Sequence, residues 1–256
     1  MLDHPLRELA GRTAVVTGSS SGIGRAIALE LAAAGAAVLV HARSRLDAAK
    51  ETGAAIRERG SESTIRLFDL AGEGSHEALV AAAWQWRGDV DIWVNNAGAD
   101  VLTGEAARWS FEQKLAHLWR VDVTATLRLS RLAGARMKAR GTGTIINMGW
   151  DQVEYGMAGD SGELFAAVKG AVMAFSKSLA RSLAPEVRVN CLAPGWIKTS
   201  WGEAASDDWQ RRAVDESLLA RWGTPHDVAR VARFLASPAA GFITGQTIAV
   251  NGGASP

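Results

Sequence analysis

The stretch Thr17-Gly18-Ser19-Ser20-Ser21-Gly22-Ile23-Gly24-Arg25 decides the fold of this 256-residue chain. It follows the short apolar run 13–16 and precedes a helical run over 26–34. The first glycine permits a tight turn, the second lets the backbone approach a pyrophosphate, and the third lets the helix pack closely on the strand. Because a helix N-terminus offers free N–H groups and positive dipole, this strand, turn and helix predict a dinucleotide-binding site.

Short apolar or β-branched runs alternate with stretches of helical period along the rest of the chain. Most of these runs are continuously apolar, as in strands that are covered on both faces of a sheet. The pattern predicts an α/β protein with one doubly wound domain over residues 1–256, a seven-stranded parallel sheet and helices on both faces. The predicted strands are 13–16, 37–41, 63–68, 92–95, 144–148, 188–192 and 247–250.

Composition and charge narrow the range of partners. The chain is 48% hydrophobic, with 28 Lys and Arg against 27 Asp and Glu and a net charge of +1. Without a run of like charges, we expect no nucleic-acid partner and no membrane partner, only a small-molecule substrate. A single cysteine, Cys191, excludes an intramolecular disulfide. Since the N-terminal residues also lack the pattern of a secretory signal, we expect a cytoplasmic location.

A longer helix is expected over residues 110–140, with Ser110 as its N-terminal cap. One face of this helix is apolar except at Asp122. A carboxylate on an apolar face is costly unless it is paired. Asp122 is therefore expected to have a partner: Lys169, which the resemblance to a known family given below places nearby, or the neighbouring backbone.

Four motifs, in order along the chain, carry a resemblance to a known family: the glycine loop, Asn95-Asn96-Ala97-Gly98, the segment 194–199 and the ending 244–253. Together they resemble the short-chain dehydrogenase/reductase family, in particular its 3-oxoacyl carrier-protein reductases and related sugar and steroid dehydrogenases. The resemblance implies a Rossmann-type domain that binds NAD(P) and interconverts carbonyls and alcohols. It also implies a homo-oligomer, a dimer or tetramer, paired through the helices 110–140 and 163–183.

The resemblance further implies a set of cofactor-binding residues. Asp69 would meet the adenine, Asn95 and its neighbours would line the middle of the cofactor, and Thr199 with the Pro194–Gly195 turn would lie near the nicotinamide. The full set is Gly18, Ser20, Ser21, Gly22, Ile23, Gly24, Arg43, Asp69, Leu70, Asn95, Ala97, Gly98, Lys169, Pro194, Gly195, Ile197 and Thr199.

The end of the second predicted strand bears on the type of cofactor. It reads His41-Ala42-Arg43-Ser44, with no acid before Asp47. An acid there would bind a ribose 2′-hydroxyl, whereas an arginine accommodates a 2′-phosphate. NADP(H) is therefore expected in preference to NAD(H), the alternative being that Arg43 is a solvated surface charge.

Family members catalyse with Ser, Tyr and Lys, supported by Asn, and here three of these four positions differ. Lys169 remains, but the tyrosine position is Phe165, the serine position falls on Trp150 and the asparagine position is Asp122. A phenyl ring has no hydroxyl and cannot transfer a proton. We expect an oxidoreductase with atypical or impaired chemistry. The alternatives are an inactive dinucleotide-binding sensor or partner of an active paralogue, and a lyase or isomerase.

The substrate pocket is expected around Trp150, Asp151, Tyr155, Trp196 and Trp201, where aromatic walls would suit a flat or apolar ligand. Tyr155 is a candidate replacement proton donor. Acids between Trp150 and Lys169 either serve the chemistry or form a solvated loop; they are Asp151, Glu154, Asp160 and Glu163. The remaining tryptophans, Trp84, Trp86, Trp93, Trp109, Trp119, Trp209 and Trp222, are expected elsewhere. No metal site is predicted, because the five histidines lack ligand spacing and are expected at the surface or on helix faces.

Overall fold

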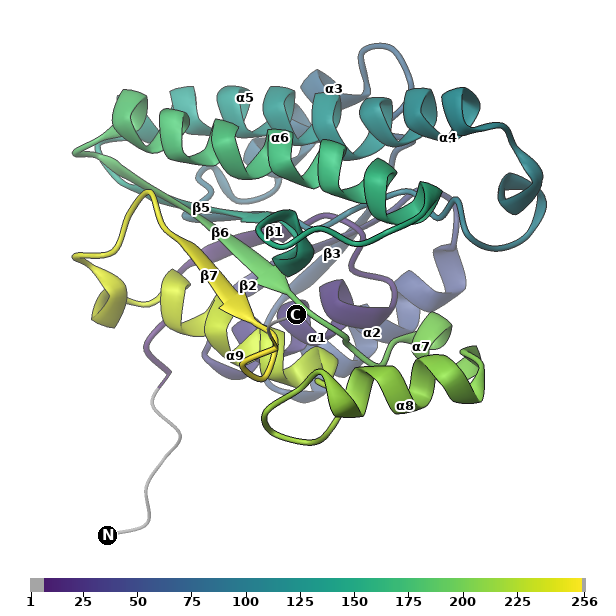
Figure 1. Cartoon of the computed structure of the whole chain (residues 1–256). Helices are drawn as coiled ribbons and strands as arrows, with labels where there is room; N and C mark the ends of the chain where they lie inside the picture. Colours follow the sequence, from purple (N-terminus) through teal and green to yellow (C-terminus); the bar gives the residue numbers. More distant parts are fainter. Residues whose placement is uncertain (1–6, 255–256) are drawn as a thin grey trace, which may run out of the picture.

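The computed structural model describes residues 7–254, and within them seven strands form one parallel sheet in the order β3-β2-β1-β4-β5-β6-β7 (Figure 1). This confirms the predicted fold. The first residues, in which no secretory pattern was found, lie partly outside the described part. The strands are β1 (Thr13–Val16), β2 (Ala37–Ala42), β3 (Ser63–Leu67), β4 (Ile92–Asn95), β5 (Gly143–Met148), β6 (Val187–Pro194) and β7 (Thr247–Val250).

Two helical layers cover the sheet (Figure 1). On one face, α1 (Gly22–Ala33), α2 (Leu46–Glu58) and α9 (Pro225–Ala236) enclose a core with β1 and β2. On the other, α3 (Ser75–Arg87), α5 (Ala125–Arg140) and α6 (Asp160–Leu183) enclose a second core around the fully buried Trp93. Burial on both faces explains why the strands are continuously apolar.

The sheet reverses its direction of growth at β1. From β1 the chain adds β2 and β3 on one side, then crosses back to add β4 on the other. The two crossover loops therefore separate above the carboxyl ends of β1 and β4. In doubly wound sheets this switch point opens the crevice in which ligands bind.

The predicted helix over 110–140 is continuous in space but not uniform. It consists of α4 (Phe111–Leu118), the π-helical η2 (Trp119–Thr124) and α5. Ser110 caps α4 in a capping box with Gln113, as the sequence predicted for this residue. Asp122 lies inside the π-helical turn, a local widening that often marks functional positions in helices.

Four shorter elements follow strands at the carboxyl edge of the sheet: η1 (Glu105–Arg108), η3 (Asp151–Val153), α7 (Ser200–Ala204) and α8 (Asp207–Asp215). A fifth, η4 (Pro238–Ala240), precedes β7 at the amino edge. Across residues 7–254, none of the helices has the length and apolar character needed to cross a bilayer. The same residues contain no group of three or more His, Cys, Asp or Glu placed to hold a metal ion.

Candidate functional site

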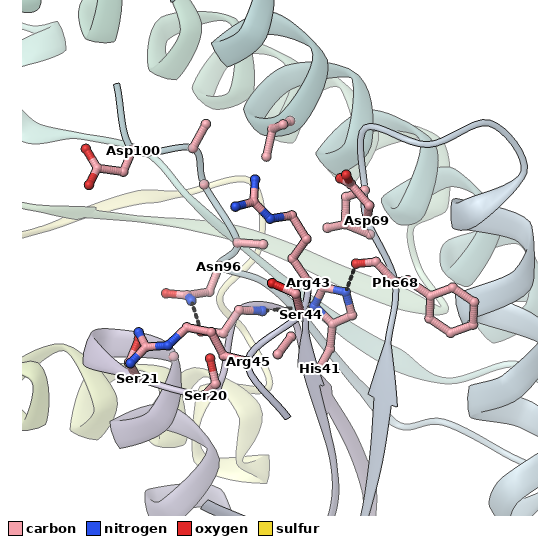
Figure 2. Close-up of a pocket in the computed structure, with 18 of the residues that line it drawn as sticks. Ser20, Ser21, His41, Arg43, Ser44, Arg45, Phe68, Asp69, Asn96 and Asp100 are labelled. Carbon is pink, nitrogen blue, oxygen red and sulfur yellow. Dashed lines mark hydrogen bonds between the residues drawn. The ribbon is translucent and has the colours of Figure 1, made fainter. Parts of the chain in front are cut away.

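A cavity of about 530 Å³ lies at the switch point, and we name it the glycine-loop cavity. Figure 2 shows its walls, which come from the ends of β1 to β4 and the start of α1. Of the residues expected to bind a cofactor, its lining includes Gly18, Ser20, Ser21, Ile23, Gly24, Arg43, Asp69, Leu70, Ala97, Gly98 and Thr199.

Two glycines make the loop possible. Gly18 has φ +64°, and a Cβ there would lie 2.8 Å from Ala97 Cα. A Cβ at Gly24 would overlap the Gly18 carbonyl oxygen and the Asn96 side chain. The loop thus brings the first turn of α1 against the strand ends, and its backbone leaves a cradle that suits a pyrophosphate at a helix N-terminus.

His41 fixes the glycine loop to the neighbouring strands. Its Nδ1 accepts a hydrogen bond from the Gly18 N–H at 3.1 Å, and its Nε2 donates to the Phe68 carbonyl at 3.0 Å. Burial lowers the pKa of His41 to about 4, so the ring is neutral at pH 7. The expectation that the histidines lie at the surface or on helix faces is therefore wrong for His41, which is buried in β2, while His76 lies on α3 as a buried helix-face residue. Both rings belong to the packed interior.

Two arginines line the glycine-loop cavity where β2 ends. Arg43 and Arg45 leave the strand in different directions, and both are exposed (Figure 2). Among residues 7–254, neither guanidinium has a hydrogen-bond or ion-pair partner. Asp69 follows the neighbouring strand β3, and its Oδ1 accepts a hydrogen bond from the Ala71 N–H at 2.9 Å. Sequence analysis named Arg43 and missed Arg45, although both are basic residues at the same strand end.

Asn95 does not line either cavity, so its expected place beside a cofactor is wrong. Its Oδ1 accepts from the Trp93 indole at 2.8 Å, and its Nδ2 donates to Ser130 and Asn147, also at 2.8 Å. The side chain is buried beneath the sheet's carboxyl edge. The next residue, Asn96, lines both cavities, and its Nδ2 donates a hydrogen bond to the Thr17 carbonyl at 3.0 Å.

A second cavity of about 540 Å³, the aromatic cavity, joins the first through the shared residues Ile23, Asn96 and Thr199. Four residues expected to touch a cofactor line this second cavity and not the first: Lys169, Pro194, Gly195 and Ile197. Gly22, also expected to touch a cofactor, is in neither lining, and a Cβ there would lie 3.7 Å from the Thr199 side chain. The two cavities are thus neighbours that share three lining residues and differ in the chemistry of the rest.

Lys169 reaches the aromatic cavity from α6 and is held by Asp122. Its Nζ lies 2.8 Å from Asp122 Oδ1, with the two side chains 15% and 2% exposed. Asp122 Oδ2 accepts a hydrogen bond from the Ala99 N–H at 2.8 Å. The predicted ion pair is confirmed, and the alternative, a backbone hydrogen bond, is present on the other oxygen. The carboxylate therefore ties Lys169 to the loop that follows β4.

Aromatic side chains form two walls of this cavity. Trp150 and Phe165 meet edge to face with ring centroids 6.1 Å apart. Opposite them, Trp196 and Trp201 stack at 6.3 Å, and Trp209 from α8 contacts both. The expectation that Trp209 and Trp222 lie elsewhere is wrong, because Trp209 lines the cavity and Trp222 packs behind Trp196 and Trp201.

Asp151 and Tyr155 are absent from the lining of the aromatic cavity, contrary to expectation. Asp151 is 3% exposed and accepts from Asn251 at 3.2 Å, while its Oδ1 has no partner. Burial raises the pKa of Asp151 to about 6. Tyr155 is 48% exposed, which removes the basis for a role as replacement proton donor. The other acids of this segment are exposed, but only Glu154 lies in a loop, since Asp160 and Glu163 belong to the first turn of α6.

Comparison with known proteins assigns the family. A family model described as Enoyl-(Acyl carrier protein) reductase matches residues 18–255. The 3-oxoacyl-[acyl-carrier-protein] reductase of Vibrio cholerae is 37% identical over 248 residues, which cover 96% of this chain and 98% of the relative. The chain therefore belongs to the short-chain dehydrogenase/reductase family, a family of oxidoreductases, as the four motifs predicted.

Solved structures agree with this assignment. A 7α-hydroxysteroid dehydrogenase, complexed with NADH and 7-oxo glycochenodeoxycholic acid, is 29% identical with a TM-score of 0.88, covering 99% of this chain and 98% of its own. A gluconate 5-dehydrogenase from Burkholderia cenocepacia, complexed with NADP and tartrate, is 31% identical with a TM-score of 0.85, covering 97% and 96%. The whole sheet and both helical layers are thus shared with dehydrogenases.

Proposed function

We propose that the protein is an NADP(H)-dependent oxidoreductase of the carbonyl and alcohol class whose proton step does not use a tyrosine. The observation that carries this proposal is that the two cavities are neighbours. The cavity built on the glycine loop at a helix N-terminus shares Ile23, Asn96 and Thr199 with the cavity that holds Lys169. This is the arrangement needed to hold a dinucleotide with its reactive end beside a second ligand.

The residues at the glycine loop fit a dinucleotide. The loop cradle suits the pyrophosphate, and Asp69 and Leu70 line the end of the cavity that would take the adenine. Related structures hold NADH in one case and NADP in another, so the choice between them rests on this chain. Arg43 and Arg45 are unpartnered in the described residues and stand where a ribose 2′-phosphate would need positive charge.

When bound, the reduced dinucleotide supplies a hydride to the substrate carbon. Lys169 has one partner, Asp122, and its ammonium also faces the aromatic cavity. It can therefore orient the cofactor or hydrogen-bond to a developing negative oxygen. Phe165 fills the wall beside it without a transferable proton. Because general acid–base help is typically worth ~10²- to 10⁴-fold, we expect simple ketones to be poor substrates.

We also propose that the chain self-associates through α4, η2, α5 and α6. Trp119, on the outward side of this helical layer, is 47% exposed, and an exposed indole of this kind is common at protein interfaces. Sedimentation or light scattering of the purified chain tests this. A monomer at micromolar concentration would contradict it.

The function is tested by titrating the purified protein with NADPH and, in parallel, NADH. The ten tryptophans provide a donor for energy transfer to a bound reduced nicotinamide. We expect saturable binding of both, with NADPH at least ~10-fold tighter. A hydrogen bond between an arginine and the 2′-phosphate would contribute ~1.5–3 kcal/mol to the binding free energy of NADPH alone. Absence of saturable binding by either dinucleotide would overturn the assignment.

A further inference from the structure

Contacts outside the aromatic cavity hold part of its tryptophan wall in place. Trp196 donates its indole N–H to Glu216 Oε2 at 2.6 Å. Arg212 lies over the rings of Trp196 and Trp209, at 5.7 and 5.0 Å from their centroids. The polar edge of Trp196 is thus satisfied away from the cavity. A ligand that enters meets preorganised rings and loses little free energy to ordering them.

The cavity is also electrically neutral. Lys169 is the only charged residue among its described lining residues, and Asp122 balances that charge at 2.8 Å. An anionic ligand would lose its hydration without meeting a free cation. A cationic ligand would find Lys169 nearby and Arg212 already occupying ring faces on the tryptophan wall. The lining therefore favours an uncharged ligand, which loses the least hydration free energy on entering the cavity.

The shape of the walls selects a flat ligand. The rings that line the cavity fall into two groups in contact, Trp150 with Phe165 and Trp196 with Trp201 and Trp209. Figure 1 shows their elements, with α6 on one side of the sheet edge and α7 and α8 on the other. Rings presented from both sides favour stacking or edge contacts with a third ring system. The volume of about 540 Å³ is within the ~300–1,000 Å³ range of small-molecule pockets.

The available proton chemistry narrows the ligand further. Ser161, Thr199 and Lys169 carry the only side-chain O–H or ammonium groups in the described lining, and the lining contains no Tyr, His, Cys, Asp or Glu. A simple alcohol is about as weak an acid as water, whose pKa is ~16, whereas a phenol has a pKa of ~10. A carbonyl compound whose reduced form is a phenolate therefore needs far less help from a proton donor.

We propose that the aromatic cavity binds uncharged quinones of two or three fused rings and that, resting on the proposed function, the protein reduces them to hydroquinones with NADPH. The exchange balances with one proton from water. One C–H bond of the dihydronicotinamide breaks as its hydride passes to one quinone oxygen, where an O–H bond forms. The electron pair shifts through the ring to the other oxygen, which becomes a phenolate and takes the proton. The quinone is reduced by two electrons and the dinucleotide is oxidised. Lys169 hydrogen-bonds to the phenolate oxygen before it is protonated.

Binding is measured first, without nucleotide and without oxygen, by quenching of tryptophan fluorescence and by calorimetry. The probe is 2-methyl-1,4-naphthoquinone, which we expect to bind at least ~10-fold more tightly than the non-planar 1-decalone or the anionic 1,4-naphthoquinone-2-sulfonate. Covalent capture by the protein is disfavoured, because burial raises the pKa of the single cysteine, Cys191, to about 12. Equal affinity for the three probes would overturn the ligand class.

A matched pair of variants locates the binding. Trp201→Leu is expected to weaken naphthoquinone binding ~10-fold through loss of one aromatic wall and to leave NADPH affinity within twofold. Trp86→Leu, on α3 and far from both cavities, should change neither. Equal losses in the two variants, or no loss in Trp201→Leu, would place the quinone elsewhere and overturn the proposal.

Turnover with NADPH separates this inference from the proposed function. We expect reduction of the naphthoquinone at least ~100-fold faster than that of 2-acetylnaphthalene, a flat ketone whose product is an ordinary alcohol. If NADPH binds but the naphthoquinone is not reduced faster, the quinone assignment fails and the oxidoreductase function stands. If the naphthoquinone binds but no dinucleotide does, the proposed function fails together with the reduction step.

Discussion

The glycine-loop cavity and the aromatic cavity meet at three residues, yet they are built in opposite ways. The first is made largely of backbone, from a loop in which two glycines allow close approach and a histidine ties the strands together. The second is made of large side chains drawn from β5, α6, α7 and α8. The backbone cavity retains what a dinucleotide requires. The side-chain cavity is lined mainly by rings, so the two cavities offer a ligand different chemistry.

The ion pair between Lys169 and Asp122 lies at the boundary of the two cavities, and its removal is expected to have the largest effect. Lys169→Met leaves the carboxylate of Asp122, 2% exposed, without its cation. Removing one partner of a buried pair typically costs ~3–5 kcal/mol, and we expect a loss of that size in the free energy of unfolding measured with urea. The double variant Lys169→Met with Asp122→Asn should recover most of it, since an amide oxygen still accepts from Ala99.

The exposed pair Lys50 and Asp47, 3.6 Å apart on α2, provides the control. Lys50→Met should change the unfolding free energy by less than ~0.5 kcal/mol, as expected for a solvated pair. If Lys169→Met were equally neutral, the charge of Asp122 would not be buried in solution, and the boundary between the two cavities would be open to water.

The backbone cavity is predicted to be intolerant of one added methyl group. In Gly24→Ala the new Cβ overlaps the Gly18 carbonyl oxygen, which is backbone and can give way only by moving the loop. Overpacking of this kind costs ~1–3 kcal/mol, so NADPH affinity should fall by up to ~100-fold while naphthoquinone affinity changes little. Gly170→Ala on α6 is the control, because its Cβ would meet Val153 at an ordinary 3.5 Å. Wild-type NADPH affinity in Gly24→Ala would contradict the close approach.

The sequence predicted the backbone cavity well and the side-chain cavity only in part, for a physical reason. Strands, helix caps and the glycine loop depend on neighbours within a few residues, so their pattern is local. The π-helical turn at 119–124 and the inward face of Trp209 are set by packing between segments far apart in the chain. The same holds for Asn95 and Asp151, whose burial depends on partners such as Ser130 and Asn251. Composition showed many tryptophans but not which of them converge.

Beside the aromatic cavity, Asp151 gives the protein a measurable pH dependence. Its pKa is raised to about 6 by burial, above the ordinary value, so the folded state holds a proton that the unfolded chain has released. The carboxyl therefore lowers stability as pH rises from about 4 through 6. Asp151→Asn should stabilise the fold at pH 7.5 by ~1–2 kcal/mol and have little effect at pH 4. Glu154→Gln, at an exposed position of the same segment, is the control; an equal gain at both pH values in Asp151→Asn would contradict the buried charge.

The smallest expected effect concerns the choice between NADPH and NADH at the glycine-loop cavity. Arg43 and Arg45 are exposed and make no ion pair within residues 7–254, so replacing them disturbs no other contact. Arg43→Ala should lower the ratio of NADPH to NADH affinity by ~10-fold, with Arg45→Ala giving a similar or smaller change, because the 2′-phosphate is the only group that distinguishes the two ligands. The lowered ratio should come from weaker NADPH binding alone, since NADH has no phosphate at that place. Arg57→Ala, also basic and outside the cavity, should leave the ratio unchanged. An unchanged ratio in both Arg43→Ala and Arg45→Ala would mean that the open end of β2 does not select the dinucleotide, and that the two arginines are solvated charges.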